Sequence, residues 1–137
     1  MNKIIFNGKI LKEENLMFNQ FKRAVNFGDG FFETIRIING KEIFFEDHFT
    51  RIKSGLNFLK IDYPSSFNFN FLKQEIHSLL EINNIDAGGK VKIYFFRSGS
   101  GTYKPLSNKI SYVIETIKLN SNFYELNKKG YLVSIFN

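Results

Sequence analysis

The sequence predicts an α+β domain in which two helices pack on one face of an antiparallel sheet. Asn-Gly pairs separate short apolar runs in the first part of the chain, a pattern typical of β-hairpins. Two stretches of helical periodicity follow, and two more apolar, alternating runs come after them. This order, four strands, two helices and two strands, predicts an antiparallel sheet with both helices on one face.

The chain opens with two predicted hairpins. An Asn-Gly pair at 7–8 separates the runs 3–6 and 9–11, and a second pair at 39–40 separates the strand FFETIRII from the run KEIFF. A type I′ turn needs positive φ at both central residues, which Asn and Gly tolerate well. Between the hairpins, a polar and irregular stretch is expected up to about Ala24.

The first strand of the second hairpin is expected to border a cleft or solvent, because neither of its faces is wholly apolar. Side chains alternate between the two faces of a strand. The residues of one face are Phe32, Thr34 and Arg36, and those of the other are Phe31, Glu33, Ile35 and Ile37.

The middle of the chain switches to a helical pattern. Apolar residues within 46–60 fall on one stripe of a helix, and two acidic residues suit its first turn, where the helix dipole favours negative charge. A second amphipathic helix is predicted at about 69–83. Two further strands, 90–96 and 109–117, complete the predicted sheet.

The sequence predicts a domain at residues 1–118 and a polar interdomain linker at 119–130. The run YLVSIF lies within 131–137, which we expect to be the first strand of a truncated second domain. That strand has no partner left in the sequence.

Composition excludes several classes of protein. The 137 residues include no cysteine, so disulfides, thiolate metal sites and a cysteine nucleophile are excluded. His48 and His77 cannot form a metal centre by themselves, and no apolar run approaches the roughly 18 residues that span a bilayer. The N-terminus is charged where a signal peptide would be apolar. We therefore expect a cytoplasmic protein without a metal site or a membrane partner.

The net charge of +6 could indicate a nucleic-acid partner. However, the lysines are scattered, with no run longer than Lys128-Lys129, and the aromatic residues alternate as core residues instead of forming a stacking face. A mildly basic, solvated surface accounts for the charge, and we expect no nucleic-acid binding.

Three features could carry chemistry. The segment 28–30, Gly-Asp-Gly, suits either a simple turn or the close approach of a ligand to backbone. Arg51 lies off the apolar stripe of its helix, beside His48 and Gly55, and the small residue leaves room for an anion at the guanidinium fork. A surface arginine would give the same pattern. The Gly- and Ser-rich loop 97–108 is longer than a hairpin requires, as functional loops and flexible connections both are.

Taken together, these segments resemble the N-terminal domain of the class IV (fold type IV) aminotransferases, a family that includes branched-chain and D-amino-acid aminotransferases and aminodeoxychorismate lyase. Arg23 followed by FGDGFFETIR is similar to the family pattern R-x-x-x-[YF]-G-D-G-x-[FY]-E-[TG]-[IL]-R. FEDHFTRIKSGL is similar to its [EF]-x-H-x-x-R-L-x-x-S-A helix, and KVKIYFFRSGSGTYKP resembles its strand and R-G-x-G-x-R-G-Y loop. The resemblance covers nearly the whole chain, in order.

The resemblance implies pyridoxal 5′-phosphate as cofactor, a small-molecule amino substrate and a homodimer. Arg51 corresponds to the arginine that binds the cofactor phosphate, and Phe32 to an aromatic residue that lines the substrate pocket. The loop 97–105 corresponds to one that, in family members, reaches toward the neighbouring subunit's active site. Its residues Arg97, Tyr103 and Lys104 are therefore expected to bind substrate.

The resemblance also implies that the Schiff-base lysine is absent from these residues. In the family that lysine lies in the second domain, shortly after the strand that begins around Tyr131. Lys128 and Lys129 precede the strand and do not match it. We expect the 137 residues alone to be catalytically inactive.

Within the family, GDGFFETIR and RSGSGTY look closest to aminodeoxychorismate lyase, which eliminates pyruvate and releases 4-aminobenzoate for folate synthesis. Residues 102–104 are Thr-Tyr-Lys where D-amino-acid aminotransferases have Arg-x-His, and 90–92 are Lys-Val-Lys near the Tyr-x-Arg of bacterial branched-chain enzymes. Two alternatives stay open: part of a branched-chain-type aminotransferase, and a non-catalytic binding or interaction module that uses its unpartnered last strand for assembly.

Overall fold

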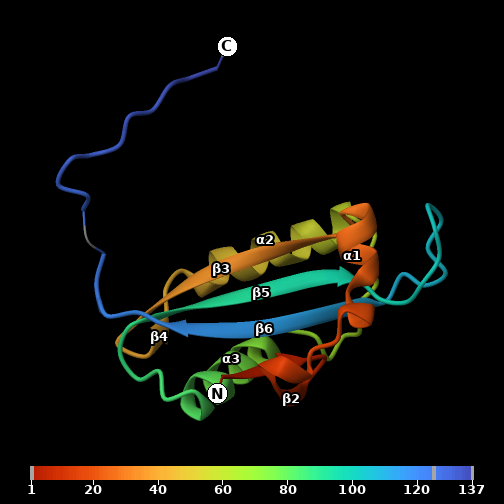
Figure 1. Ribbon diagram of the computed structural model, residues 1–137, viewed down its shortest axis with the longest axis horizontal. Helices are drawn as coiled ribbons and strands as arrows, with labels where there is room; N and C mark the ends of the chain where they lie inside the picture. The colour runs from red at the N-terminus through yellow and green to blue at the C-terminus, as the bar shows by residue number, and fades with distance from the viewer. Residues whose placement is uncertain (1, 125, 137) are drawn as a thin grey trace.

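The computed structural model describes residues 2–124 and 126–136. Within them, a single antiparallel sheet has the strand order β2-β1-β6-β5-β3-β4 (Figure 1). The strands are β1 (Lys3–Phe6), β2 (Lys9–Lys12), β3 (Gly30–Ile38), β4 (Lys41–Glu42), β5 (Gly89–Arg97) and β6 (Ile110–Lys118).

Two long helices, α2 (Phe45–Phe58) and α3 (Phe69–Ile82), pack on the same face of the sheet. Alternate side chains of the central strands, such as Ile35 and Ile93, are fully buried against apolar residues of the helices, such as Ile52 and Leu72. These helices follow the predicted periodic segments to within two residues at each end. The predicted fold class, an antiparallel sheet with two helices on one face, is confirmed.

The opposite side of the sheet is called the open face below. It carries Phe32, Tyr94, Phe96, Val113 and Glu115 from β3, β5 and β6. The segment between the two hairpins partly covers this face. It contains two short 3₁₀ helices, η1 (Glu13–Asn15) and η2 (Phe18–Gln20), and a short helix α1 (Lys22–Phe27).

The helix α1 is a correction to the predicted irregular stretch. Its six residues are too few for a periodic pattern, and the helix is stabilised by packing: Phe21 and Ala24 lie against Ile4, Phe96 and Val113 of the open face. The chain leaves α1 at a left-handed glycine, Gly28, as helices often do.

The two hairpin turns are as predicted, but the second hairpin is shorter than expected. Asn7 and Asn39 have φ of 48° and 50°. The run KEIFF, predicted as a strand, pairs with β3 only through Lys41 and Glu42. Phe45 begins α2 instead, because its ring is buried in the helix core.

Residues after β6 leave the sheet. Ser121 and Phe123 accept hydrogen bonds from Arg36, and residues 126–136 form no strand within the described part of the chain. The domain boundaries at 118 and 130 and the strand at 131–137 stay predictions, and residue 137 lies outside the described residues. No helix among the described residues is long and apolar enough to cross a membrane.

Candidate functional site

The candidate site is built on Glu33 of β3, whose carboxylate lies on the helix side of the sheet. Arg51 of α2 binds it in a bidentate manner: Nε donates to Oε1 at 3.0 Å and Nη2 donates to Oε2 at 2.9 Å. This geometry, two parallel N–H···O bonds, is the one that fixes the plane of a guanidinium. The Glu33 side chain is only 12% exposed, so the fork is attached to a rigid part of the sheet.

His48, one turn before Arg51 on α2, completes the cluster. Its Nδ1 lies beside Oε2 of Glu33 and 2.9 Å from Nη2 of Arg51. One ring nitrogen cannot donate to a carboxylate and accept from a guanidinium at the same time. Because the contact with Glu33 is the shorter, we assign the Nδ1 proton to the bond with that carboxylate.

The cluster is an ion pair with a defined charge state. Burial pushes the pKa of Glu33 upward, but hydrogen bonds and charge from Arg51 and His48 outweigh burial and hold that pKa below its usual value. The same carboxylate raises the pKa of Arg51. At neutral pH the site therefore holds a carboxylate and a guanidinium, both ionised.

Arg51 keeps donors available for a ligand. Its side chain is 60% exposed, and among the described residues its Nη1 has no hydrogen-bond partner. A guanidinium that is fixed by one carboxylate and open at its remaining nitrogen can bind a phosphate or carboxylate. The site can therefore accept an anion.

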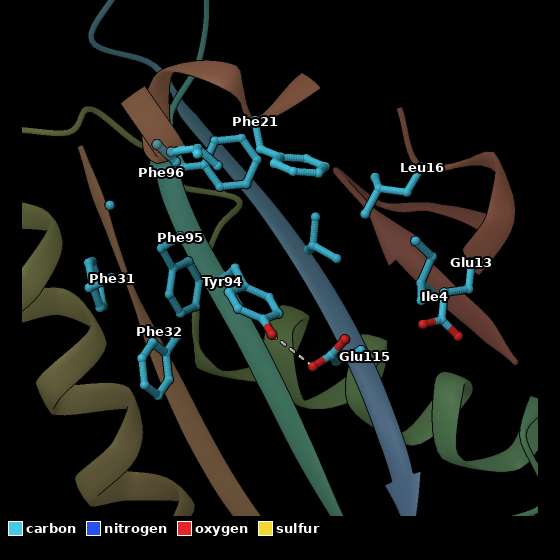
Figure 2. A pocket seen from close by; sticks show the side chains of 14 residues that line it. Ile4, Glu13, Leu16, Phe21, Phe31, Phe32, Tyr94, Phe95, Phe96 and Glu115 are labelled. Atoms are coloured by element: carbon cyan, nitrogen blue, oxygen red, sulfur yellow. Dashed lines mark hydrogen bonds between the residues drawn. The ribbon is translucent and has the colours of Figure 1, made fainter. Parts of the chain in front are cut away.

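The position of this cluster on the sheet matters for what else a ligand would meet. β4 pairs with β3 only at residues 37 and 38, so the first part of β3 has no strand on its outer side. Phe32, the residue before Glu33, points to the open face (Figure 2). Arg51 on the helix side and Phe32 on the open face therefore lie on the two sides of the same edge of the sheet.

The open face beside Phe32 combines aromatic rings with charge. Nζ of Lys92 lies 4.5 Å from the ring centroid of Phe32 and 4.7 Å from that of Tyr94. The hydroxyl of Tyr94 donates to Glu115 at 2.9 Å (Figure 2). A cavity of about 480 Å³ extends from here over the face; it is lined mainly by apolar side chains, among them Ile4, Leu16, Phe21, Phe32, Phe96 and Val113.

The structure does not bring the three predicted loop residues to this edge. Arg97 is buried, and its guanidinium donates to Asp29, Asn108 and the carbonyls that follow α2. Tyr103 is 92% exposed, and Lys104 beside it is exposed as well. Their loop extends past the end of the sheet in Figure 1, next to α1.

Other features of the site were not foreseen from the sequence. The room expected beside Gly55 is filled by Phe31, because a Cβ at Gly55 would lie 2.7 Å from that ring. The partner of Arg51 was missed, although alternation along β3 did place the charged Glu33 on an otherwise apolar face. Lys92 and Glu115 come from different strands, so no local signal linked them to Phe32.

Comparisons with known proteins identify relatives of this chain by sequence. A family described as amino-transferase class IV matches residues 30–132. A D-alanine aminotransferase of Bacillus licheniformis is 32% identical over 87 residues, which cover 64% of this chain and 30% of that protein. A D-alanine aminotransferase of Staphylococcus haemolyticus is 29% identical over 89 residues, which cover 65% of this chain and 31% of that protein. The chain thus spans about a third of the length of these curated relatives.

Solved structures share the fold at low sequence identity. A branched-chain aminotransferase from Thermoproteus uzoniensis aligns with a TM-score of 0.73 and 19% identity, over 87% of this chain and 41% of that one. The PLP form of a branched-chain amino acid aminotransferase from Thermobaculum terrenum aligns with a TM-score of 0.72 and 16% identity, over 88% and 41%. A protein from Legionella pneumophila, described as a putative 4-amino-4-deoxychorismate lyase, aligns with a TM-score of 0.63 and 21% identity. The alignment covers 77% of this chain and 37% of that one.

Proposed function

The chain belongs to the class IV aminotransferase family, and we propose that it forms the phosphate-anchoring and substrate-lining part of an enzyme that uses pyridoxal 5′-phosphate on a small amino substrate. The observation that carries the proposal is the Arg51 guanidinium. Glu33 fixes its Nε and Nη2, and Nη1 has no acceptor among the described residues. A phosphate needs such oriented, unoccupied donors.

The residues at the edge of β3 fit this cofactor. Arg51 would donate to the phosphate, while Glu33 and His48 would keep the guanidinium in one orientation. When bound, pyridoxal 5′-phosphate supplies an electron sink for the carbon that carries the substrate's amino group. Phe32 would pack against the substrate, and Lys92 would attract a substrate carboxylate on the open face.

Two reaction classes are supported by different observations. We favour a lyase of the aminodeoxychorismate type, which releases pyruvate and 4-aminobenzoate, because the segments GDGFFETIR and RSGSGTY resemble that group. An amino-acid aminotransferase is the second candidate, because the D-alanine aminotransferases are similar to more than 60% of the chain. In either case the catalytic lysine would come from outside these residues.

We also propose that the protein works as a homodimer. Tyr103 and Lys104 lie on an exposed loop beyond the end of the sheet, away from the cavity that Phe32 lines. In this proposal they contact substrate in the neighbouring subunit. In this proposal Arg97 acts indirectly, through the loop that follows it, because it is buried.

The phosphate assignment is tested by titrating the chain with pyridoxine 5′-phosphate, followed by NMR. This ligand keeps the ring and phosphate but has no aldehyde to react with surface lysines. Arg51→Ala should weaken its binding at least tenfold and leave the weaker binding of pyridoxine unchanged. Lys53→Ala is the matched control, since it removes one exposed cation from the same helix. Equal affinities in Arg51→Ala and the parent chain would contradict the assignment.

The reaction class is tested in a protein that carries this chain together with a lysine-bearing second domain. A lyase should release pyruvate from aminodeoxychorismate without any 2-oxo acid being added. An aminotransferase should require a 2-oxo acid and convert it to the amino acid. The second result would overturn the lyase proposal and leave the cofactor proposal standing.

A further inference from the structure

Three charged side chains meet in the interior at one end of the sheet. Asp29 precedes β3, Arg97 ends β5 and Arg23 lies on α1. Nε of Arg23 donates to Oδ2 of Asp29, and Nε of Arg97 donates to the same oxygen at 3.0 Å. All three side chains are nearly buried, so one carboxylate compensates two guanidinium groups that would otherwise repel each other without hydration.

The remaining donors of the two arginines bind the loop and the end of α2. Nη1 of Arg23 donates to the carbonyl of Thr102 at 2.7 Å, and Nη1 of Arg97 donates to Oδ1 of Asn108 at 2.6 Å. Arg97 also donates to the carbonyl of Lys60 at 3.0 Å, just after α2. The carboxylate of Asp29 therefore sets where both guanidinium groups lie, and these hold the loop against the helix that carries the candidate site.

The tip of the loop is closed by contacts between its two sides. The amide of Leu106 donates to the carbonyl of Ser100 at 3.2 Å, and Gly101 pairs with Pro105. Gly101 has a φ of +108°, and a Cβ there would lie 2.6 Å from the carbonyl oxygen of Lys104. Arg23 holds one side of the loop through the carbonyl of Thr102, and Arg97 holds the other side through Asn108, so the contacts between the two sides depend on both arginines.

We propose that Asp29 is a positioning residue: by holding Arg23 and Arg97 together, it fixes the loop of residues 98–108 relative to α2. The structural part of this proposal concerns only the described residues. Its consequence for the reaction rests on the proposed function, in which Tyr103 and Lys104 at the tip of the loop contact substrate.

The structural part is tested by hydrogen exchange, without any assay of activity. In Asp29→Asn the amides of Ser98 and Leu106, which bind carbonyls at the base and within the loop, should exchange at least tenfold faster. The amide of Ile93 in the middle of β5 should keep its rate. The matched control is Glu42→Gln, which removes another nearly buried carboxylate, one that binds Lys73 and His77 far from the loop.

A second variant covers the case in which Asp29→Asn does not fold. Arg23→Met leaves the ion pair of Asp29 and Arg97 intact, so the sheet should form. It removes the guanidinium that donates to the carbonyl of Thr102. Leu106 should again exchange at least tenfold faster than in Glu42→Gln. Unchanged exchange at Leu106 in Arg23→Met, or equal acceleration in Glu42→Gln, would overturn the proposal.

The consequence for the reaction has its own readout. In an active enzyme that contains this chain, Arg23→Met should raise KM severalfold while the affinity for pyridoxal 5′-phosphate stays unchanged, because the loop lies away from Arg51. Faster exchange with an unchanged KM would support the positioning role and contradict the proposed substrate contacts of the loop. Unchanged exchange with an unchanged KM would contradict the positioning role itself.

Discussion

Two clusters of similar composition lie at the edges of the helix layer, and they differ in how the cation is held. In the first, Glu33 binds His48 and Arg51 of α2. In the second, Glu42 of β4 binds Lys73 and His77 of α3, each at 2.9 Å. Both therefore join a strand glutamate to a histidine and a cation one turn apart on a helix.

The clusters differ in how the cation uses its donors. Each oxygen of Glu42 binds one partner, and both partners are half exposed, so the cluster fastens α3 to the end of the β3–β4 hairpin. Arg51 instead donates to Glu33 through Nε and Nη2, and its Nη1 has no hydrogen-bond partner among the residues that the structure describes. The comparison teaches that a planar guanidinium can be fixed by two parallel bonds and still present a further nitrogen in a defined direction, whereas the lysine ammonium makes one contact with Glu42 and its other donors are not oriented by it.

The largest expected effect concerns the close packing of α2, which carries the first cluster, against β3. Gly55→Ala places a Cβ 2.7 Å from the ring of Phe31, which is packed on Phe95. Either the ring or α2 must shift, so we expect the free energy of unfolding to fall by about 1–2 kcal/mol. Urea unfolding measures it, and Ser54→Ala, an exposed neighbour on α2, serves as control. No loss of stability would mean that the close approach of α2 to β3 is not required.

The next effect tests the fork itself. Arg51→Lys keeps the positive charge but replaces the three nitrogens of the guanidinium with one. The lysine therefore cannot bind Glu33 through two parallel bonds and a phosphate at the same time. We expect the affinity for pyridoxine 5′-phosphate to fall about tenfold, or about 1.4 kcal/mol. Lys73→Arg, the reverse change in the second cluster, should leave that affinity unchanged. A gain of binding in Lys73→Arg would show that the fork alone, without its position at the edge of β3, makes the site.

Periodicity explains why most of the fold could be predicted. The two helices have clear apolar stripes, and the Asn-Gly pairs mark turns with positive φ at Asn7 and Asn39. The short helix α1 could not be predicted, because its stability comes from packing on a sheet face assembled from distant strands. The run KEIFF forms a strand only at Lys41–Glu42, for a related reason: aromatic residues favour strands locally, but Phe45 is buried in the helix core.

The candidate site could be predicted only in part. Arg51 and Phe32 were identified from motifs, and the alternation along β3 placed Phe32 on the opposite face from Glu33. The pairing of Glu33 with Arg51 joins residues 18 positions apart on different elements, which no local pattern specifies. Arg97 looked like a loop residue available to substrate, and its burial depends on contacts with Asp29 and Asn108 that only the fold brings together.

The smallest expected effect concerns the titration of the two glutamates. In both, burial alone would raise the pKa, but hydrogen bonds and charge from their partners outweigh burial, so the pKa of Glu33 and that of Glu42 lie below the usual value of a glutamate. A carboxylate whose folded-state pKa is lowered stabilises the fold above its unfolded pKa, and this contribution disappears as pH falls through the folded value. Glu33→Gln and Glu42→Gln should each reduce the acid-dependent loss of stability by roughly 1 kcal/mol or less.

A ligand should make these two titrations diverge. A phosphate bound at Arg51 adds negative charge beside Glu33 and competes for the same guanidinium, so it should raise the pKa of Glu33 toward its usual value. Glu42 lies in the other cluster and should titrate as before. Side-chain carboxyl NMR with and without pyridoxine 5′-phosphate measures both. If the pKa of both glutamates shifts equally, the ligand acts on the whole protein and not at Arg51; if that of Glu33 alone rises, the two clusters differ in function as their geometry indicates.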